Sequence, residues 1–142
     1  MNGVLDASMA LAWLFIRTKP AEAALADQTL RDLASTSWVV PAIWHAEVAN
    51  GLLRGERAGL IQSLQTTFFL DRLSLAKIET DQESPRTLQV SSLTLARAYK
   101  LTAYDASYLE LVLRTGRPLA TFDQKLAEAV RTAGGQVFGD AQ

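Results

Sequence analysis

Short apolar runs alternate along the chain with longer segments in which apolar side chains recur every three or four residues. The short runs lie at about 3–5, 38–40, 75–79 and 118–122, and their length and composition are typical of buried β-strands. The longer segments have the periodicity of helices that bury one face. We place these helices at about 8–16, 21–34, 42–54, 60–70, 85–99, 106–114 and 123–133, with a break at 55–59 and a last short strand at 136–138.

Strands and helices that alternate in this way predict an α/β fold, because parallel strands need a crossover connection that a helix usually supplies. We therefore expect a three-layer α/β/α domain in which a sheet of four or five parallel strands lies between helices. No linker, internal repeat or low-complexity tract divides the sequence, and residues 1–142 are expected to form a single domain.

The composition excludes several kinds of catalytic and metal site, but it says little about binding partners. The chain has no cysteine and one histidine, which excludes a disulfide framework, a thiolate zinc site, a cysteine nucleophile and a histidine-rich metal site. The net charge of −1 neither favours nor excludes nucleic acid, because a local basic surface can coexist with overall neutrality. The sequence lacks a signal-peptide pattern and a run of ~20 apolar residues, so we expect a cytoplasmic protein without a membrane segment.

Four carboxylates stand at informative positions. Asp6 and Asp123 directly follow apolar strands, Asp105 opens a helix, and Glu47 lies in the helix after the second strand. If the first and fourth strands are neighbours, Asp6 and Asp123 meet at one edge of the sheet, where α/β proteins bind ligands. Carboxylates packed together repel one another, and a bound divalent cation commonly neutralises this repulsion.

Three of these carboxylates also have a simpler interpretation as helix N-caps. An aspartate at the start of a helix commonly accepts a hydrogen bond from a free backbone amide, and this role is open to Asp6, Asp105 and Asp123. For Asp105 the helical wheel argues against it, because the side chain falls on the apolar face between Leu109 and Val112. A carboxylate there is costly unless it is paired or binds a metal ion.

Glu47 has the weakest individual signal. It shares a polar stripe with Asn50 and Arg54 on its predicted helix, and such a stripe is most often solvated. Taken alone, Glu47 is therefore expected to be a surface residue and not a site residue.

Taken together, the segments around these residues resemble a PIN domain, and specifically the toxin ribonucleases of the VapC type found in bacterial toxin-antitoxin pairs. They occur in the family's order, and the resemblance spans nearly the whole chain. The resemblance is carried by residues 4–8 (VLDAS), 41–50 (PAIWHAEVAN), 101–106 (LTAYDA) and 119–126 (LATFDQKL).

The resemblance implies a cleft in which Asp6, Glu47, Asp105 and Asp123 are catalytic residues and ligands of Mg²⁺ or Mn²⁺, with Ser8 and Thr121 as supporting hydroxyls. Oxygen ligands suit these hard cations. A bound ion would polarise the phosphate and activate a water molecule for in-line attack on an RNA phosphodiester. The products implied are a 5′-phosphate and a 3′-hydroxyl, formed without a covalent enzyme intermediate.

The resemblance also implies three partners, which are an RNA substrate, a cognate antitoxin that covers the cleft, and a second copy of the chain. The apolar stretch 68–70 is a candidate for a homodimer interface. Tryptophans at 13, 38 and 44 could stack bases, although their apolar neighbours favour the core, and His45 is expected to be structural. Candidate cations for the RNA backbone are Arg54, Arg57, Arg97, Lys100, Arg114, Arg117 and Lys125.

Two other functions remain open from the residues alone. The first is a phosphatase-like α/β domain with Asp6 as nucleophile, although Ser8 replaces the second aspartate of the usual Asp-x-Asp pattern. The second is a non-catalytic module that keeps the fold and binds RNA or protein, which four intact carboxylates disfavour.

Overall fold

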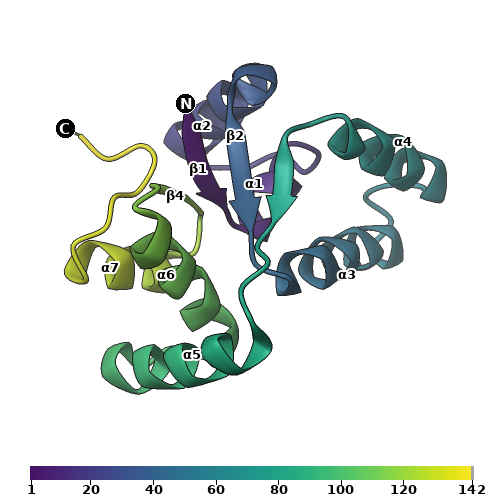
Figure 1. Ribbon diagram of the computed structural model, residues 1–142. Helices are drawn as coiled ribbons and strands as arrows, with labels where there is room; N and C mark the ends of the chain where they lie inside the picture. The colour runs from purple at the N-terminus through teal and green to yellow at the C-terminus, as the bar shows by residue number, and fades with distance from the viewer. Residues whose placement is uncertain (142) are drawn as a thin grey trace.

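A four-stranded parallel sheet forms the centre of the protein, whose computed structural model describes residues 1–141 (Figure 1). The strand order is β3-β2-β1-β4, so the first and last strands are neighbours, which is the condition under which Asp6 and Asp123 meet at one edge. Val4 and Leu5 of β1 pair with Leu119 and Ala120 of β4. The strands are β1 (Asn2–Leu5), β2 (Ser37–Val40), β3 (Ile78–Thr80) and β4 (Leu119–Ala120).

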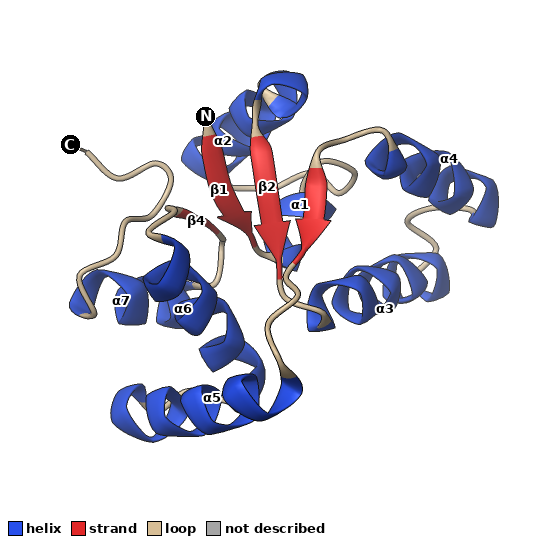
Figure 2. Ribbon diagram, in the orientation of Figure 1, coloured by secondary structure: helices blue, strands red, loops and turns tan. Residues whose placement is uncertain are grey.

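Helices flank the sheet and connect its strands (Figure 2), which confirms the predicted α/β class. None of the helices within residues 1–141 has the length and apolarity needed to cross a membrane. The helices are α1 (Ala7–Leu11), α2 (Pro20–Arg31), the 3₁₀ turn η1 (Leu33–Ser35), α3 (Ile43–Arg57), α4 (Ser63–Ser74), α5 (Pro85–Tyr99), α6 (Ala103–Thr115) and α7 (Gln124–Thr132).

The core is built around the strands and the helix faces that cover them. Val4, Leu5, Val40, Leu119 and Ala120 have no exposed surface, and apolar burial of this kind is the main favourable term in folding. The tryptophans belong to this core as favoured by their neighbours, since residues 38 and 44 are buried and residue 13 packs against the core cluster.

The bounds of α1 and α3 differ from the prediction. Two glycines of α3 lie against side chains of the segment that contains α1 and the residues after it. A Cβ at Gly51 would lie 2.3 Å from Leu11, and one at Gly55 would lie 2.4 Å from Phe15. Gly55 is therefore buried inside α3 and does not end it, so the predicted break at 55–59 was wrong at its start. α1 ends at Leu11, and turns, instead of the predicted continuous helix, carry the chain on to Phe15.

Other boundaries also moved. α4 begins later than the predicted 60–70, because Gln62 and Gln65 form a capping box at its start. It also ends later, at Ser74. The third strand lies at 78–80, and Leu75 is an exposed C-cap of α4. The predicted last strand at 136–138 is a single bridge from Val137 to Leu119, held by hydrogen bonds of 2.9 Å on either side.

Candidate active site

The carboxyl ends of β1 and β4 bring Asp6 and Thr121 together, although 114 residues separate them in the chain. Asp6 is buried, and its Oδ2 accepts hydrogen bonds from Ser8 Oγ at 2.6 Å and from Thr121 Oγ1 at 2.7 Å. The two hydroxyls for which the family resemblance implies a supporting role therefore both donate to the same carboxylate oxygen. A buried carboxylate needs such donors, because burial otherwise disfavours its charge.

The same two hydroxyls also position the chain that follows β4. Ser8 Oγ accepts a hydrogen bond from the backbone N–H of Phe122 at 2.9 Å, and Thr121 Oγ1 accepts one from the N–H of Asp123 at 2.9 Å. The loop that carries Asp123 is thus tied to the hydroxyls that hold Asp6.

Only one of the three aspartates caps a helix with its side chain. Asp123 Oδ1 accepts the N–H of Leu126 at 3.0 Å at the start of α7. Asp6 occupies the N-cap position of α1 but makes no cap hydrogen bond there. The cap of α6 is Thr102, which accepts the N–H of Asp105 at 3.1 Å. The carboxylate of Asp105 is therefore not required for helix capping, as its place on the apolar face indicated.

Glu47 reaches the site through a partner that the sequence did not reveal. The buried hydroxyl of Tyr108 donates a 2.6 Å hydrogen bond to Glu47 Oε1, so Glu47 is held by α6 and is not simply a solvated residue of α3. Tyr108 lies one turn after Asp105 on α6, a spacing that puts both residues on one face of the helix. That spacing is the only sequence signal that could have pointed to Tyr108.

The four carboxylates are close enough for their charges to interact. Burial raises the pKa of Asp6, and the charge of Asp123 raises it further against the lowering effect of the two hydroxyls. Burial is also the main cause of the raised pKa values of Glu47 and Asp105, and both are raised further by neighbouring carboxylates, Asp6 among them. Each of these three groups therefore resists ionisation in part because of at least one neighbouring carboxylate.

The donor set fits a hard divalent cation. No ion pair within residues 1–141 involves any of the four carboxylates, and all their donor atoms are oxygens, which Mg²⁺ and Mn²⁺ prefer. In the same part of the chain, no three His, Asp or Glu side chains stand close enough to form a metal site as they are placed. The carboxylates thus share one region without a ready-made coordination shell. One oxygen of Glu47 and one of Asp123 also accept hydrogen bonds from the protein, from Tyr108 and from the N–H of Leu126.

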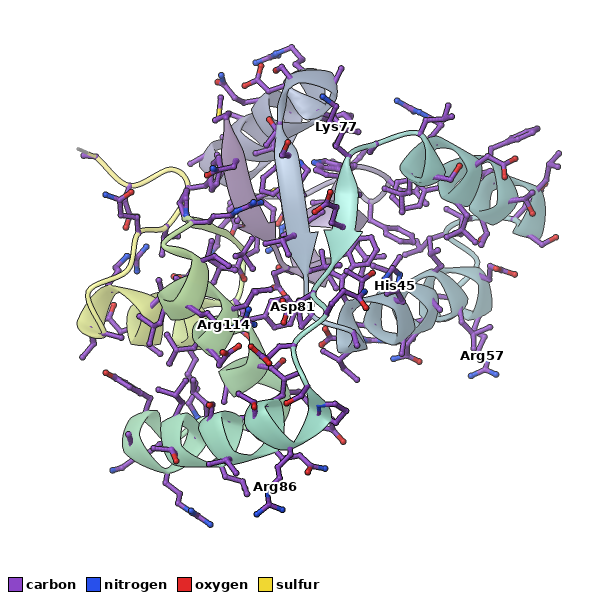
Figure 3. All side chains as sticks on the ribbon, viewed as in Figure 1. His45, Arg57, Lys77, Asp81, Arg86 and Arg114 are labelled. Carbon is purple, nitrogen blue, oxygen red and sulfur yellow. The ribbon has the colours of Figure 1, made fainter. Side chains whose placement is uncertain are left out.

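The candidate cationic residues differ in whether they already form ion pairs within the protein. Arg114 forms ion pairs with Asp81 at 2.5 Å and Glu110 at 2.7 Å, and Figure 3 shows Arg114 and Asp81 pointing toward one another. These partners raise the pKa of Arg114 and engage the guanidinium in the fold. Lys125 lies near the site, since its charge lowers the pKa of Asp105. His45 Nε2 lies 2.7 Å from Thr80 Oγ1.

Comparison with known protein families identifies the class of protein to which this fold belongs. The family model of the PIN domain matches residues 3–131, and the chain therefore belongs to the PIN domain family.

Two relatives from Pyrobaculum aerophilum narrow the comparison. The chain is 31% identical over 132 residues to a protein named Ribonuclease VapC3, a match that covers 90% of this chain and 94% of the relative. It also resembles the crystal structure of PAE2754 with a TM-score of 0.65 and 23% identity, over 91% of this chain and 87% of the other. The likeness to the crystal structure shows a shared fold. The sequence match shows similarity to a protein of the VapC type.

The raised pKa of Asp105 predicts a pH-dependent stability. Because the folded protein holds this proton more tightly than the unfolded chain, the favourable contribution is present at acid pH and is lost as pH rises through the raised pKa. In chelator-treated protein, Asp105→Asn should therefore gain stability over the wild type increasingly from pH 4 to pH 8, as measured by urea unfolding. Asp71→Asn, at an exposed position on α4, is the control. A stability difference for Asp105→Asn that does not change with pH would contradict the interpretation.

Proposed function

We propose that this protein is a Mg²⁺- or Mn²⁺-dependent endoribonuclease that acts as the toxin of a toxin-antitoxin pair. The observation that carries the proposal is a set of four carboxylates whose charges interact, with Asp6 and Asp123 after β1 and β4, Glu47 on α3 and Asp105 on α6. None of them is neutralised by an ion pair in the described chain. Its family membership and its identity to a protein named as a ribonuclease support RNA as the substrate.

Asp6, Asp105 and Asp123 would hold the cation, directly or through water, and Glu47 would be a further ligand or would orient the attacking water. When bound, the cation stabilises negative charge on the phosphate and makes water a better nucleophile. Asp6 is fixed by Ser8 and Thr121, so its position does not depend on solvent. Glu47 keeps one oxygen for Tyr108 and can offer the other to a water molecule or to the cation. Tyr108 itself is a poor acid, because burial and nearby carboxylates raise its pKa.

The phosphatase-like alternative requires Asp6 as a nucleophile. Both Ser8 and Thr121 donate to Oδ2 of this carboxylate, which lowers its nucleophilicity and suits a fixed ligand better. A phosphoenzyme is therefore not expected.

Cleavage of a mixed panel of structured and single-stranded RNAs should require Mg²⁺ or Mn²⁺ and stop with EDTA. Asp6→Asn keeps an acceptor for both hydroxyls but removes the charge, and it should lower the rate about 100-fold or more, since each ~1.4 kcal/mol of lost transition-state stabilisation costs tenfold. Asp71→Asn is the matched control. Metal-independent cleavage, or full activity in Asp6→Asn, would rule out the proposed mechanism, and cleavage of phosphomonoesters alone would favour the phosphatase.

A double-mutant cycle tests whether Tyr108 acts through Glu47. Tyr108→Phe should lower kcat roughly 10-fold, because a hydrogen bond to a charged group contributes on the order of 1.5–3 kcal/mol. In a Glu47→Gln background the same change should cost little more, since the partner charge is already gone. Tyr104→Phe, at an exposed position on the same helix, should behave as wild type. Fully additive losses would instead assign Tyr108 to packing alone.

We further infer a homodimer and an inhibitory antitoxin. Within the stretch 68–70, Phe69 is buried in the core, but Phe68 is 58% exposed and Leu64, one turn earlier on α4, is 59% exposed. These two side chains share a helix face and form an apolar surface of the kind that a two-fold interface covers. The antitoxin rests on the family alone.

Sedimentation equilibrium at micromolar concentration should therefore give a dimer, and Phe68→Glu should give a monomer with an unchanged circular dichroism spectrum. Val90→Glu, on the exposed surface of α5, is the control and should remain dimeric. A monomeric wild type, or a Phe68→Glu variant that still dimerises, would remove α4 as the interface.

A further inference from the structure

A pocket of about 450 Å³ opens beside the carboxylates, between the segment that follows α1 and the second half of α3. Its volume lies within the range of pockets that hold small ligands, roughly 300–1,000 Å³. Leu11 and Phe15 form part of its walls, where they pack against Gly51 and Gly55 of α3. Ser8 also lines the pocket, so the pocket and the carboxylate cluster share a residue.

The charges that line this pocket are opposite to those of the neighbouring cluster. Arg17 and Arg54 are its charged lining residues, and no carboxylate lines it. Arg54 is exposed and takes part in no ion pair within residues 1–141. A basic pocket therefore adjoins an acidic cluster at the end of the sheet.

Arg17 links the pocket to the loop after β4. Its guanidinium lies over the ring of Phe122 at 4.6 Å from the centroid, which is a cation–π contact. One terminal nitrogen pairs with Glu22 at 3.1 Å, while the buried Nε has no hydrogen-bond acceptor in the described chain. A buried donor without an acceptor is unfavourable, and an anionic ligand would supply one.

We infer that this pocket binds one nucleotide of single-stranded RNA, next to the phosphate that is cleaved. Arginine is the preferred partner of phosphate oxygens, so Arg17 and Arg54 would bind the phosphate of the neighbouring nucleotide. The base would lie against the apolar wall that includes Phe15, as unpaired bases do on aromatic side chains. The shared Ser8, whose hydroxyl binds Asp6, places this nucleotide directly beside the carboxylates. The inference rests on the proposed ribonuclease function.

Steady-state kinetics on a short single-stranded RNA tests the pocket through two of its residues. Arg54→Ala should raise KM about tenfold and leave kcat nearly unchanged, because it removes a contact outside the reacting centre. Ala58→Trp fills the pocket from an exposed lining position and should raise KM at least as much. The control is Arg86→Ala, since Arg86 points away from the body of the protein at the start of α5 (Figure 3), and it should match the wild type.

Binding of the same RNA to Asp6→Asn, followed by fluorescence anisotropy, separates binding from cleavage. Adding Arg54→Ala should weaken binding and reduce the slope of log affinity against log salt by about 0.7, the expected loss of one phosphate contact on a single strand. Removing the base next to the cleaved phosphate should weaken binding to Asp6→Asn, but should have little further effect once Ala58→Trp has filled the pocket.

The outcomes distinguish this inference from the function on which it rests. If the wild type cleaves no RNA with Mg²⁺ or Mn²⁺, the proposed function fails, and the anisotropy experiment still reports whether the pocket binds RNA. If the wild type cleaves RNA and both pocket variants have the KM of Arg86→Ala, the pocket inference is wrong while the function stands. If the two variants keep RNA affinity but lose binding of the antitoxin, the pocket belongs to a protein partner, which also overturns the inference.

Discussion

The hydrogen bonds from Ser8 and Thr121 to Asp6 are the contacts on which the rest of the candidate site depends. They place a carboxylate in the interior at the point where β1 and β4 end, and they reduce the penalty of burying it there. Through the same hydroxyls, the backbone of residues 122 and 123 is held against β1. The parallel pairing of β1 with β4 therefore determines the position of Asp6 and also that of Asp123.

Much of this arrangement could be predicted from the sequence because its signals are local. A buried strand that ends in an aspartate is visible in residues 3–6 and again in 119–123, and neighbouring parallel strands bring such ends together. The contact between Glu47 and Tyr108 spans 61 positions and leaves no periodic trace. The ion pair of Arg114 with Asp81 is likewise long-range, since it spans 33 positions. The pairing of Arg114 with Glu110 four residues earlier on α6 is local, so this engagement of Arg114 could have been anticipated.

Glycine and aspartate show why local rules also fail. Glycine is typical of a helix end, but Gly55 lies inside α3, where it packs against Phe15. The ring of Phe15 occupies the space that a side chain at position 55 would need. Asp105 and Asp123 both stand near helix starts, yet only Asp123 caps its helix. The deciding factor was a residue outside the aspartate itself, Thr102, which already supplies the cap of α6.

β4 is only two residues long, and this shortest strand of the sheet leads into Thr121, which holds Asp6, and into Asp123, one of the four carboxylates. Its outer side is not bare, because Leu119 exchanges backbone hydrogen bonds with the segment around Val137. The segment around Val137 therefore pairs with the outer edge of β4, although it is remote in sequence from Asp6. Displacing this segment would remove those hydrogen bonds from the strand that leads into Thr121 and Asp123, without the loss of any carboxylate.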